Sequence, residues 1–162
     1  MTEIQSLGNI DIQVLTKEFV KIQTDEIIVT NERISHIKER HPEDYNLFEK
    51  YGRESVISPD LIIKDLKHCG TVFMVKKLPE TNLNVVVRVV LETDDNNLKN
   101  SVMTFYRIRD KNLKKLIEKN RLLYIKYKGF TQRIIEVEIV LLHTLWVKRN
   151  VGRGTPTNNS LV

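Results

Sequence analysis

The chain has 162 residues, of which 41% are hydrophobic and 29% charged, with a formal net charge of +5 at pH 7 and a pI near 9.3. This composition excludes fibrous and intrinsically disordered proteins, and the length suits one domain that buries a core without disulfides. The positive charge favours a negatively charged partner, and nucleic acid is the commonest such partner for a small basic domain.

The cysteine content and the N-terminus both indicate the cytoplasm. A single cysteine, Cys69, cannot form an internal disulfide, so a reducing compartment is expected. The first residues, MTEIQSLGNIDIQ, are polar and acidic where a secretion signal would be basic and then apolar, and no run reaches ~18 apolar residues. The sequence therefore predicts no export signal, no membrane span and no membrane partner, and it gives no indication of the oligomeric state.

A short strand followed directly by a helix is predicted early in the chain. Residues 27–30, IIVT, have the β-branched content of a strand, and Thr30 can cap the helix after it. Glu32, in the first turn of that helix, would interact favourably with the positive end of the helix dipole. The helix should end at His41, because Pro42 disfavours helical geometry for the residue before it.

A second helix is predicted in the segment SPDLIIKDLKHCG, residues 58–70. Ser58 would be its N-cap, Pro59 its first position and Gly70 its terminator. The helix would lead into the sheet.

Three strands are predicted next, in TVFMVKK (71–77), NVVVRVVL (84–91) and SVMTFYRI (101–108). All three are rich in β-branched and aromatic residues and are separated by polar connections, which is typical of an antiparallel meander. Asp110 can then cap a final helix. The apolar residues of that helix expected to face the sheet are Leu113, Leu116 and Ile117.

This order of elements predicts an α+β fold, with N-terminal helices packed on an antiparallel sheet of about four strands and a C-terminal helix. Residues 132–147, QRIIEVEIVLLHTLWV, fit either a long strand or a buried helix, because periodicity alone does not separate the two. Residues 152–162 have the composition of a disordered tail.

The heptapeptide HIKERHP, residues 36–42, carries the first candidate site. At about 100° per residue, Arg33, His36 and Arg40 fall within about 60° of one another, so the helix has a basic edge beside an apolar one. Neutral histidine could remove the 2'-hydroxyl proton of RNA, histidinium could protonate the leaving oxygen, and arginine could stabilise the phosphorane charge. The alternative is that the edge is solvated surface and that His41 is a cap.

The strand NVVVRVVL carries a second candidate, Arg88. Arg88 shares a strand face with Val86 and Val90, because alternate side chains point to the same side. Burying an unpaired arginine there would be costly. Arg88 is therefore expected to meet a carboxylate or to open onto a site where an anion binds.

The next strand extends this candidate if the two strands form a hairpin with aligned apolar faces. The alignment predicts Arg88 opposite Thr104, Tyr106 near Val86, and Ser101 on the opposite face. A guanidinium, a hydroxyl and a phenol on one face could bind a phosphate. The alternative is that Thr104 and Tyr106 fill ordinary cross-strand positions.

No metal or cofactor is expected. His36 and His41 are five residues apart, whereas helical zinc ligands are four apart, and Glu39 is misplaced for a catalytic glutamate. His68 beside Cys69 is a lone dipeptide at the end of a predicted helix. The sequence has no glycine-rich phosphate loop and no nucleophile elbow.

Several segments together resemble a known family. They are IIVTNERISHIKERHP, VISPDLIIKDL, NVVVRVVL, KNSVMTFYRI and LIEKNRLLY. In order and spacing they resemble the phage-borne nuclease domains grouped with the barnase, EndoU, colicin and RelE type of ribonuclease. The resemblance implies a metal-independent, toxin-like RNase with helices before a four-stranded antiparallel sheet, and a site drawn from the helix and the strands. Such domains usually stop near residue 128, so residues 1–128 are predicted as a nuclease-like domain and 129–162 as a C-terminal extension.

Matching positions and, for Arg33, the basic edge of the helix give the candidate residues of this site. The candidate catalytic residues are His36, Arg40, His41, Arg88, Thr104 and Tyr106. The candidate substrate-binding residues are Arg33, Asn100 and Ser101. The alignment of strand faces agrees with the resemblance for Arg88, Thr104 and Tyr106, and it disagrees for Ser101.

The resulting hypothesis is a cytoplasmic endoribonuclease in which one of the two helix histidines is the general base and the other the general acid. RNA, tRNA included, is the expected substrate, and an inhibitor or immunity protein is the expected partner class. One rival is a non-catalytic nucleic-acid-binding module that also uses the lysines of KNLKKLIEK, residues 111–119. Another is a structural domain of a phage particle that assembles through the C-terminal apolar stretch.

Overall fold

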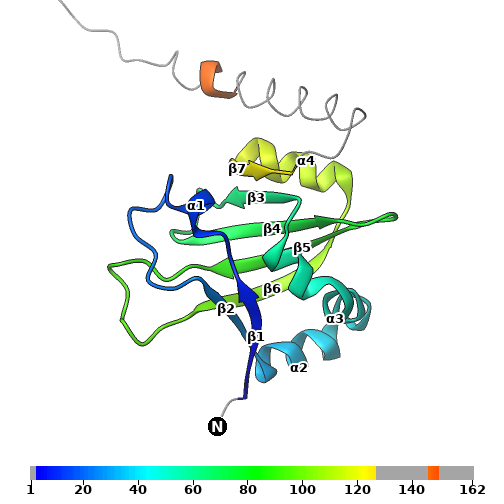
Figure 1. Cartoon of the computed structure of the whole chain (residues 1–162). Coiled ribbons are helices and arrows are strands. Elements are labelled where there is room, and N and C mark those ends of the chain that lie inside the picture. Colours follow the sequence, from blue (N-terminus) through cyan, green and yellow to red (C-terminus); the bar gives the residue numbers. More distant parts are fainter. Residues whose placement is uncertain (1–2, 127–145, 150–162) are drawn as a thin grey trace, which may run out of the picture. The chain divides into compact units, whose positions relative to one another are not determined.

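The computed structural model of the chain describes residues 3–126 and 146–149 (Figure 1). The chain divides into two units, Met1–Lys126 and Tyr127–Val162. In the second unit residues 146–149 form a single helical turn with exposed side chains. The predicted strand or helix at 132–147 falls almost wholly outside the described residues, and so does the predicted tail at 152–162.

The first unit contains seven strands and four helices in its described residues. In chain order they are β1 (Ile4–Asn9), α1 (Ile12–Leu15), β2 (Glu26–Thr30), α2 (Asn31–Arg40), α3 (Pro42–Ile57), β3 (Leu61–Lys64), β4 (Thr71–Lys77), β5 (Asn82–Arg88), β6 (Asn100–Ile108), α4 (Asp110–Lys119) and β7 (Arg121–Ile125).

All seven strands belong to one sheet, in the order β1-β2-β6-β5-β4-β3-β7. β2 and β6 pair in parallel through Ile27 with Asn100 and Ile28 with Ser101, and the other neighbouring strands pair antiparallel. The predicted antiparallel sheet of about four strands is therefore wrong in its size and in its strand directions. The chain is α+β, but its sheet is mixed, begins with an N-terminal strand and ends with β7 after the last helix.

The additional strands carry weak sequence signals. β1, IQSLGN, buries only Leu7 and contains Gly8 at a φ of 114°, so it lacks the alternation of a half-buried strand. β3 has four residues, too few for periodicity to distinguish a strand from a helix. β7 pairs with β3 and lies at the edge of the sheet, where it leaves its side chains only partly buried.

The prediction of a helix over residues 58–70 is also wrong, because the apolar run is too short for periodicity to distinguish a strand from a helix. The segment forms β3 and the turn that leads into β4, and Ser58 ends α3 instead of starting a helix, with its N–H donating to the carbonyl of Glu54. α3 itself was not predicted. Pro42 ends α2 as predicted, but it also occupies the first turn of α3, where its missing N–H costs nothing.

The strong local signals are confirmed. The Thr30 side chain accepts from the N–H of Arg33 at 3.2 Å, and α2 runs from Asn31 to Arg40 with His41 as its C-cap. β4 has the predicted bounds, whereas β5 starts earlier than predicted and ends at Arg88. α4 also forms where predicted, but its N-cap is Arg109 and not Asp110.

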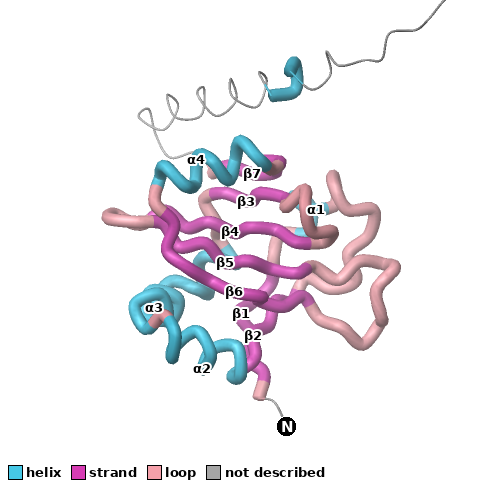
Figure 2. Tube along the Cα trace, turned by 180° about the vertical axis from the view of Figure 1, so that it is seen from behind, coloured by secondary structure: helices cyan, strands magenta, loops and turns pink. Residues whose placement is uncertain are grey.

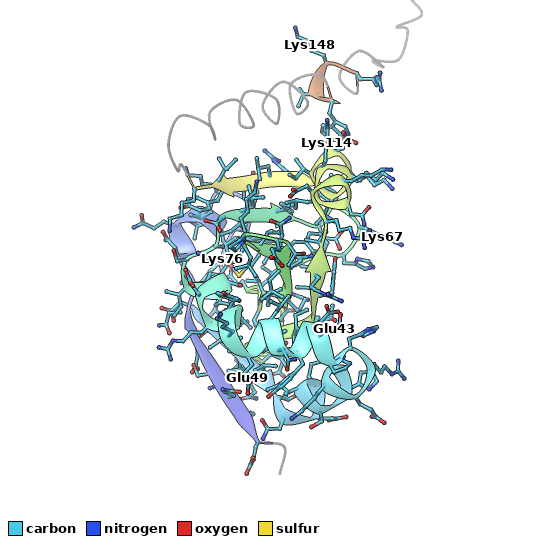
Figure 3. All side chains as sticks on the ribbon, turned by 90° about the vertical axis from the view of Figure 1, so that its right-hand side faces the viewer. Glu43, Glu49, Lys67, Lys76, Lys114 and Lys148 are labelled. Atoms are coloured by element: carbon cyan, nitrogen blue, oxygen red, sulfur yellow. The ribbon has the colours of Figure 1, made fainter. Side chains whose placement is uncertain are left out.

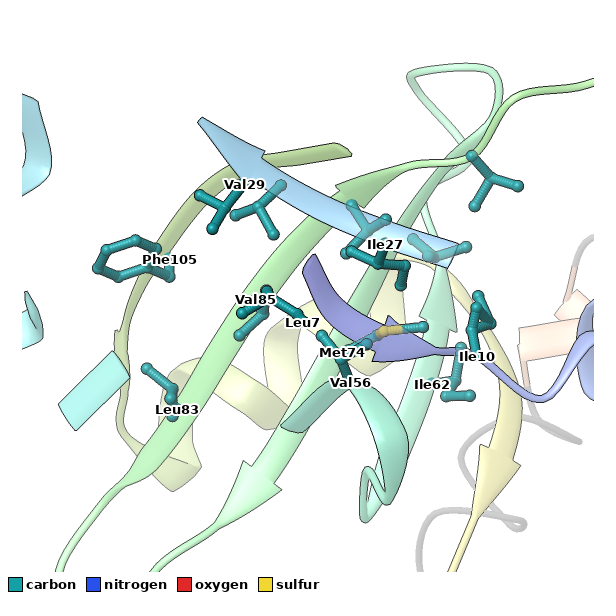
Figure 4. Packing of buried hydrophobic residues seen from close by; sticks show 14 of the residues in the cluster. Leu7, Ile10, Ile27, Val29, Val56, Ile62, Met74, Leu83, Val85 and Phe105 are labelled. Atoms are coloured by element: carbon teal, nitrogen blue, oxygen red, sulfur yellow. The ribbon is translucent and has the colours of Figure 1, made fainter. Parts of the chain in front are cut away.

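The main core lies between α3 and one face of the sheet. Phe48 of α3 stacks on Phe105 of β6, with ring centroids 3.8 Å apart and planes 6° from parallel. Gly52 allows this approach, because a Cβ there would lie 2.7 Å from the Phe48 ring. The buried residues of the strands that join this cluster, several of them labelled in Figure 4, include Ile27, Val29, Ile62, Met74, Leu83, Val85 and Val102.

The other face of the sheet carries α4 at the β7 end (Figure 2). The helix buries Leu113 and Ile117, and it turns its lysines outward. This arrangement leaves Arg88 and the polar residues of β6 on the same side of the sheet as α4. No helix among residues 3–126 and 146–149 is both long and apolar enough to cross a bilayer.

Replacement of Phe105 by alanine tests the core. The ring is fully buried, so Phe105→Ala should lower the free energy of unfolding by about 3–5 kcal/mol. Met103→Ala, on the same strand but exposed, should change it by less than about 0.5 kcal/mol. Urea denaturation of both variants measures the difference, and equal losses would contradict the described packing.

Candidate functional site

The basic edge of α2 is exposed, as the sequence predicts. Ile37 is the buried residue of this helix, and Arg33 is half-buried beside it. His36, Arg40 and His41 are solvent-exposed, and none of them makes an ion pair with a residue that the structure describes. These side chains are therefore accessible to a ligand.

Arg40 and His41 line a hollow of about 250 Å³ at the junction of α2, α3 and β6. Its other walls are Pro42, Glu43, Asp44 and Arg107. Arg107 pairs with Glu43 at 2.5 Å and with Asp44 at 2.7 Å, and the Asp44 carboxylate raises the pKa of Arg107. Arg107 is paired with these carboxylates, so Arg40 and His41 are the groups in the hollow that make no ion pair with a described residue.

The register of β5 and β6 differs from the prediction. Arg88 is opposite Ser101, Val86 is opposite Thr104, and Asn84 is opposite Tyr106, with a bulge at Met103. Arg88, Thr104 and Tyr106 do share one face, as predicted. The expectation that Ser101 lies on the opposite face is wrong, because the extra residue at the bulge restores it to the Arg88 side.

Arg88 has the carboxylate partner that its apolar surroundings require. Its Nη2 lies 3.0 Å from Oδ1 of Asp94, and its Nη1 donates to the carbonyl of Val89. The guanidinium also lies against Gly70, whose φ of 71° and missing Cβ leave room for it. Arg88 therefore connects β5 to the turn at Gly70, before β4, and to the turn at Asp94, after β5. About a third of its side chain remains exposed (33%).

The structure does not bring Arg88 together with the cations of α2. Arg88 is opposite Ser101 at the start of β6, whereas the hollow at Arg40 and His41 adjoins Arg107 near its end. Ser101 and Arg107 are six residues apart, which is roughly 20 Å along a strand at about 3.3 Å per residue. The single site predicted from the sequence therefore separates into two regions of the molecule.

Two of the strand candidates have structural partners. Asn100 is fully buried, accepts from the N–H of Val90 at 2.8 Å and donates to the carbonyl of Thr24 at 2.6 Å, so it fixes the start of β6 and does not face a ligand. The hydroxyl of Tyr106 accepts from Nδ2 of Asn84 at 2.8 Å. Thr104 is half-buried between these two positions of β6.

Tyr106 is held as a neutral phenol. Burial raises its pKa against the opposing hydrogen bond from Asn84, and the carboxylate of Asp65 raises it further. Because its oxygen already accepts a bond, the hydroxyl proton is free to be donated to an oxygen of a ligand.

An imidazole–carboxylate pair lies in the turn between β3 and β4. Nδ1 of His68 is 2.7 Å from Oδ2 of Asp65, and the imidazole is 64% exposed while the carboxylate is buried. This pair was not predicted, because the segment was expected to be helical and His68 was related only to Cys69. Asp65 and His68 are three residues apart and are followed by Gly70. This spacing would have indicated the pair if the segment had been predicted as a turn.

Hydrogen bonds hold Asp65 in its ionised form. Burial by itself would raise its pKa, but the bonds from His68 and from the backbone N–H groups of Lys67 and His68 outweigh burial, and the pKa is lowered. The N–H of Lys67 donates to Oδ1 at 2.8 Å. Both carboxylate oxygens are therefore engaged, and the imidazole has a fixed partner.

Asp65 belongs to a row of polar side chains that crosses four strands. Its N–H donates to the carbonyl of Thr71 at 3.0 Å, which extends the β3–β4 register by one pair. Thr71 is opposite Arg88, and Arg88 is opposite Ser101. We call these four residues, Asp65, Thr71, Arg88 and Ser101, the polar row; His68 stands at its β3 end.

Metal ligation finds no support in the described residues. Among residues 3–126 and 146–149, no three His, Cys, Asp or Glu side chains lie close enough together to hold an ion.

Comparison of the chain with protein-family models, with curated proteins and with solved structures gave no match. A functional assignment therefore rests on the geometry and chemistry of these side chains.

The Asp65 pair makes a prediction about stability and pH. Because its pKa is lower in the folded chain, Asp65 contributes stability that is fully present above the ordinary carboxyl range near pH 4 and is lost as pH falls through the folded-state value. Asp65→Asn should therefore be less stable than the parent protein at pH 7, and the difference should shrink below about pH 4. Urea denaturation between these pH values measures it, and a difference independent of pH would contradict the role of the carboxylate.

Proposed function

We propose that the chain is a metal-independent endoribonuclease that cleaves RNA by acid–base transesterification. The observation that carries the proposal is the set of exposed imidazoles, each next to a cation: His41 beside Arg40 in the hollow, and His68 beside Lys67 in the turn. Imidazole titrates near neutral pH and can both accept and return a proton. The net charge of +5 favours a polyanionic substrate.

The reaction needs no group beyond these side chains. A base removes the proton of a 2'-hydroxyl, the 2'-oxygen attacks phosphorus, and the bond to the 5'-oxygen breaks. Cations stabilise the extra negative charge of the pentacovalent phosphate. The products are a 2',3'-cyclic phosphate and a free 5'-hydroxyl.

In this proposal the basic edge of α2 binds the RNA backbone. His36 lies on α2 and His41 is its C-cap, and both side chains are exposed beside the arginines that would contact the RNA. Arg33 and Arg40 lie on the same side of α2 as His36 and are suited to phosphate contacts. The sequence resemblance to toxin-like phage nucleases agrees with this reaction and would place it in the cytoplasm, with an inhibitor protein as a partner.

The reaction class is tested by cleavage in the absence of metal. Purified protein should cleave single-stranded RNA in EDTA and leave cyclic phosphate and 5'-hydroxyl ends, which end-labelling after phosphatase treatment identifies. An RNA with one 2'-deoxynucleotide at the cleaved position should resist cleavage there, because the attacking oxygen is missing. Cleavage that stops in EDTA, or no cleavage of any RNA, would contradict the proposal.

A second candidate function is nucleic-acid binding without chemistry, and α4 favours it. Residues 109–119 include five cationic and two acidic side chains. The cations are Arg109, Lys111, Lys114, Lys115 and Lys119, and none of them pairs with a carboxylate in the described part of the chain. Figure 3 shows Lys67 on the same side of the sheet as Lys114, so the basic surface continues beyond the helix.

Charge removal on α4 tests this surface. The double variant Lys114→Gln/Lys115→Gln should bind single-stranded RNA more weakly, and its dependence of log K on log salt should be less steep by about 0.7 for each phosphate that no longer has a cationic partner. Lys17→Gln/Lys50→Gln removes the same charge from the turn that follows α1 and from α3, and it should change the slope little. Equal slopes for both variants would exclude α4 as the binding surface.

A further inference from the structure

We propose that His68, oriented by Asp65, is the residue that moves the proton in the proposed ribonuclease reaction, with the polar row as the reaction centre. This inference rests on the proposed function. It differs from the sequence-based expectation, which assigned the chemistry to the histidines of α2. Three features support it: the orientation of the imidazole, the cation beside it and the surface that surrounds them.

The imidazole of His68 is oriented before any substrate arrives. Its Nδ1 faces Oδ2 of Asp65 at 2.7 Å, and the other oxygen of that carboxylate is fixed by the N–H of Lys67. Because the carboxylate accepts only, Nδ1 carries a proton and Nε2 is left as the acceptor. The buried carboxylate thus selects the tautomer of an exposed imidazole, which is the arrangement that a general base requires.

A guanidinium lies against the turn that carries this imidazole. Arg88 rests against Gly70, two residues after His68, and the N–H of Val89 donates to the Gly70 carbonyl at 2.7 Å. Asp94 balances the charge of Arg88 but leaves a third of the side chain exposed. Arg88 can therefore contribute one further hydrogen bond to a phosphate at this end of the sheet.

Neutral donors of the same face complete the centre. Ser101 is opposite Arg88, and Thr104 and Tyr106 follow it along β6 on the same side. Tyr106 keeps its proton, because burial raises its pKa, and its hydroxyl can donate to an oxygen of the RNA further along β6. α4 supplies lysines beside this face, and its C-cap residue, Asn120, accepts from the N–H of Leu66 in the same turn at 3.1 Å.

The proton balance of the step is simple. Nε2 of His68 takes the proton of the 2'-hydroxyl while the 2'-oxygen forms its bond to phosphorus. The bond from phosphorus to the 5'-oxygen breaks, and that oxygen takes a proton from water. The imidazolium, stabilised by Asp65, then returns its proton to solvent. The charged groups around His68 are Asp65 and Lys67 in its own turn and Arg88 with Asp94 from the neighbouring one.

This placement also gives α2 a different role. Arg107, which lines the hollow, is opposite Leu83 on the face of the sheet that packs on α3, whereas Arg88 and the polar row are on the other face. An RNA strand bound at the polar row would contact α2 only where it passes around the edge of the sheet, away from the reacting phosphate. Substitutions in α2 should therefore raise KM, whereas substitution of His68 should lower kcat.

The experiment compares single variants of the full chain in the EDTA cleavage assay. His68→Ala should lower kcat by at least about 100-fold, and added imidazole should restore part of the activity. Asp65→Asn should lower kcat and move the acidic limb of the pH profile to lower pH, because the imidazolium loses its counter-charge. His41→Ala should mainly raise KM. Cys69→Ala, an exposed neighbour of His68, is the matched control and should retain full activity.

The outcomes separate this inference from the function on which it rests. If the parent protein cleaves RNA in EDTA and His68→Ala retains kcat within about threefold, the assignment of His68 is wrong and the ribonuclease proposal stands. A loss of kcat in His68→Ala that imidazole does not restore, together with an unchanged pH profile in Asp65→Asn, would also overturn the assignment. If the parent protein cleaves no RNA, both proposals fail. Near-UV circular dichroism confirms that each variant is folded.

Discussion

The bulge at Met103 in β6 is the constraint on which the rest of the sheet depends. Side chains of a regular strand alternate between faces, so Val102 and Phe105 could not both enter the core, nor Ser101 and Thr104 both face outward, without one extra residue between them. The bulge lies between the first residues of β6, which pair with β2 in parallel, and Phe105, which stacks on Phe48 of α3. It also places the hydroxyl-bearing residues of β6 on the face that carries Arg88.

Local sequence signals predict the elements that have clear starts and ends. The cap at Thr30 and the proline after His41 define α2, and β-branched runs define β4, β5 and β6. β3 was not predicted, because four apolar residues after a serine and a proline fit a helix start equally well, and only its pairing with β4 and β7 decides between the two. The parallel pairing of β2 with β6 likewise depends on tertiary contacts, so no local sequence pattern predicts it.

The candidate site was predictable in its residue types but not in its connections. Arg88 was expected to need a carboxylate or an anion, and the loop after β5 supplies Asp94 six residues later. The two arginine-bearing regions were expected to meet, because the sequence gives no measure of where along β6 the end of α2 lies. The pair of His68 with Asp65 was not predicted, because the turn that joins them was assigned to a helix.

The parallel pair has a further consequence for how the chain folds. Ile28 and Ser101 are neighbours in the sheet, yet all of α2, α3, β3, β4 and β5 lies between them in the chain. Closing so long a loop costs conformational entropy before any contact compensates for it. The meander of β3 to β6 can form from short-range contacts, and the antiparallel pair of β1 and β2 can join only an edge that already exists. On a ribosome, β1, β2 and α2 would emerge before β6, the strand that completes the parallel pair.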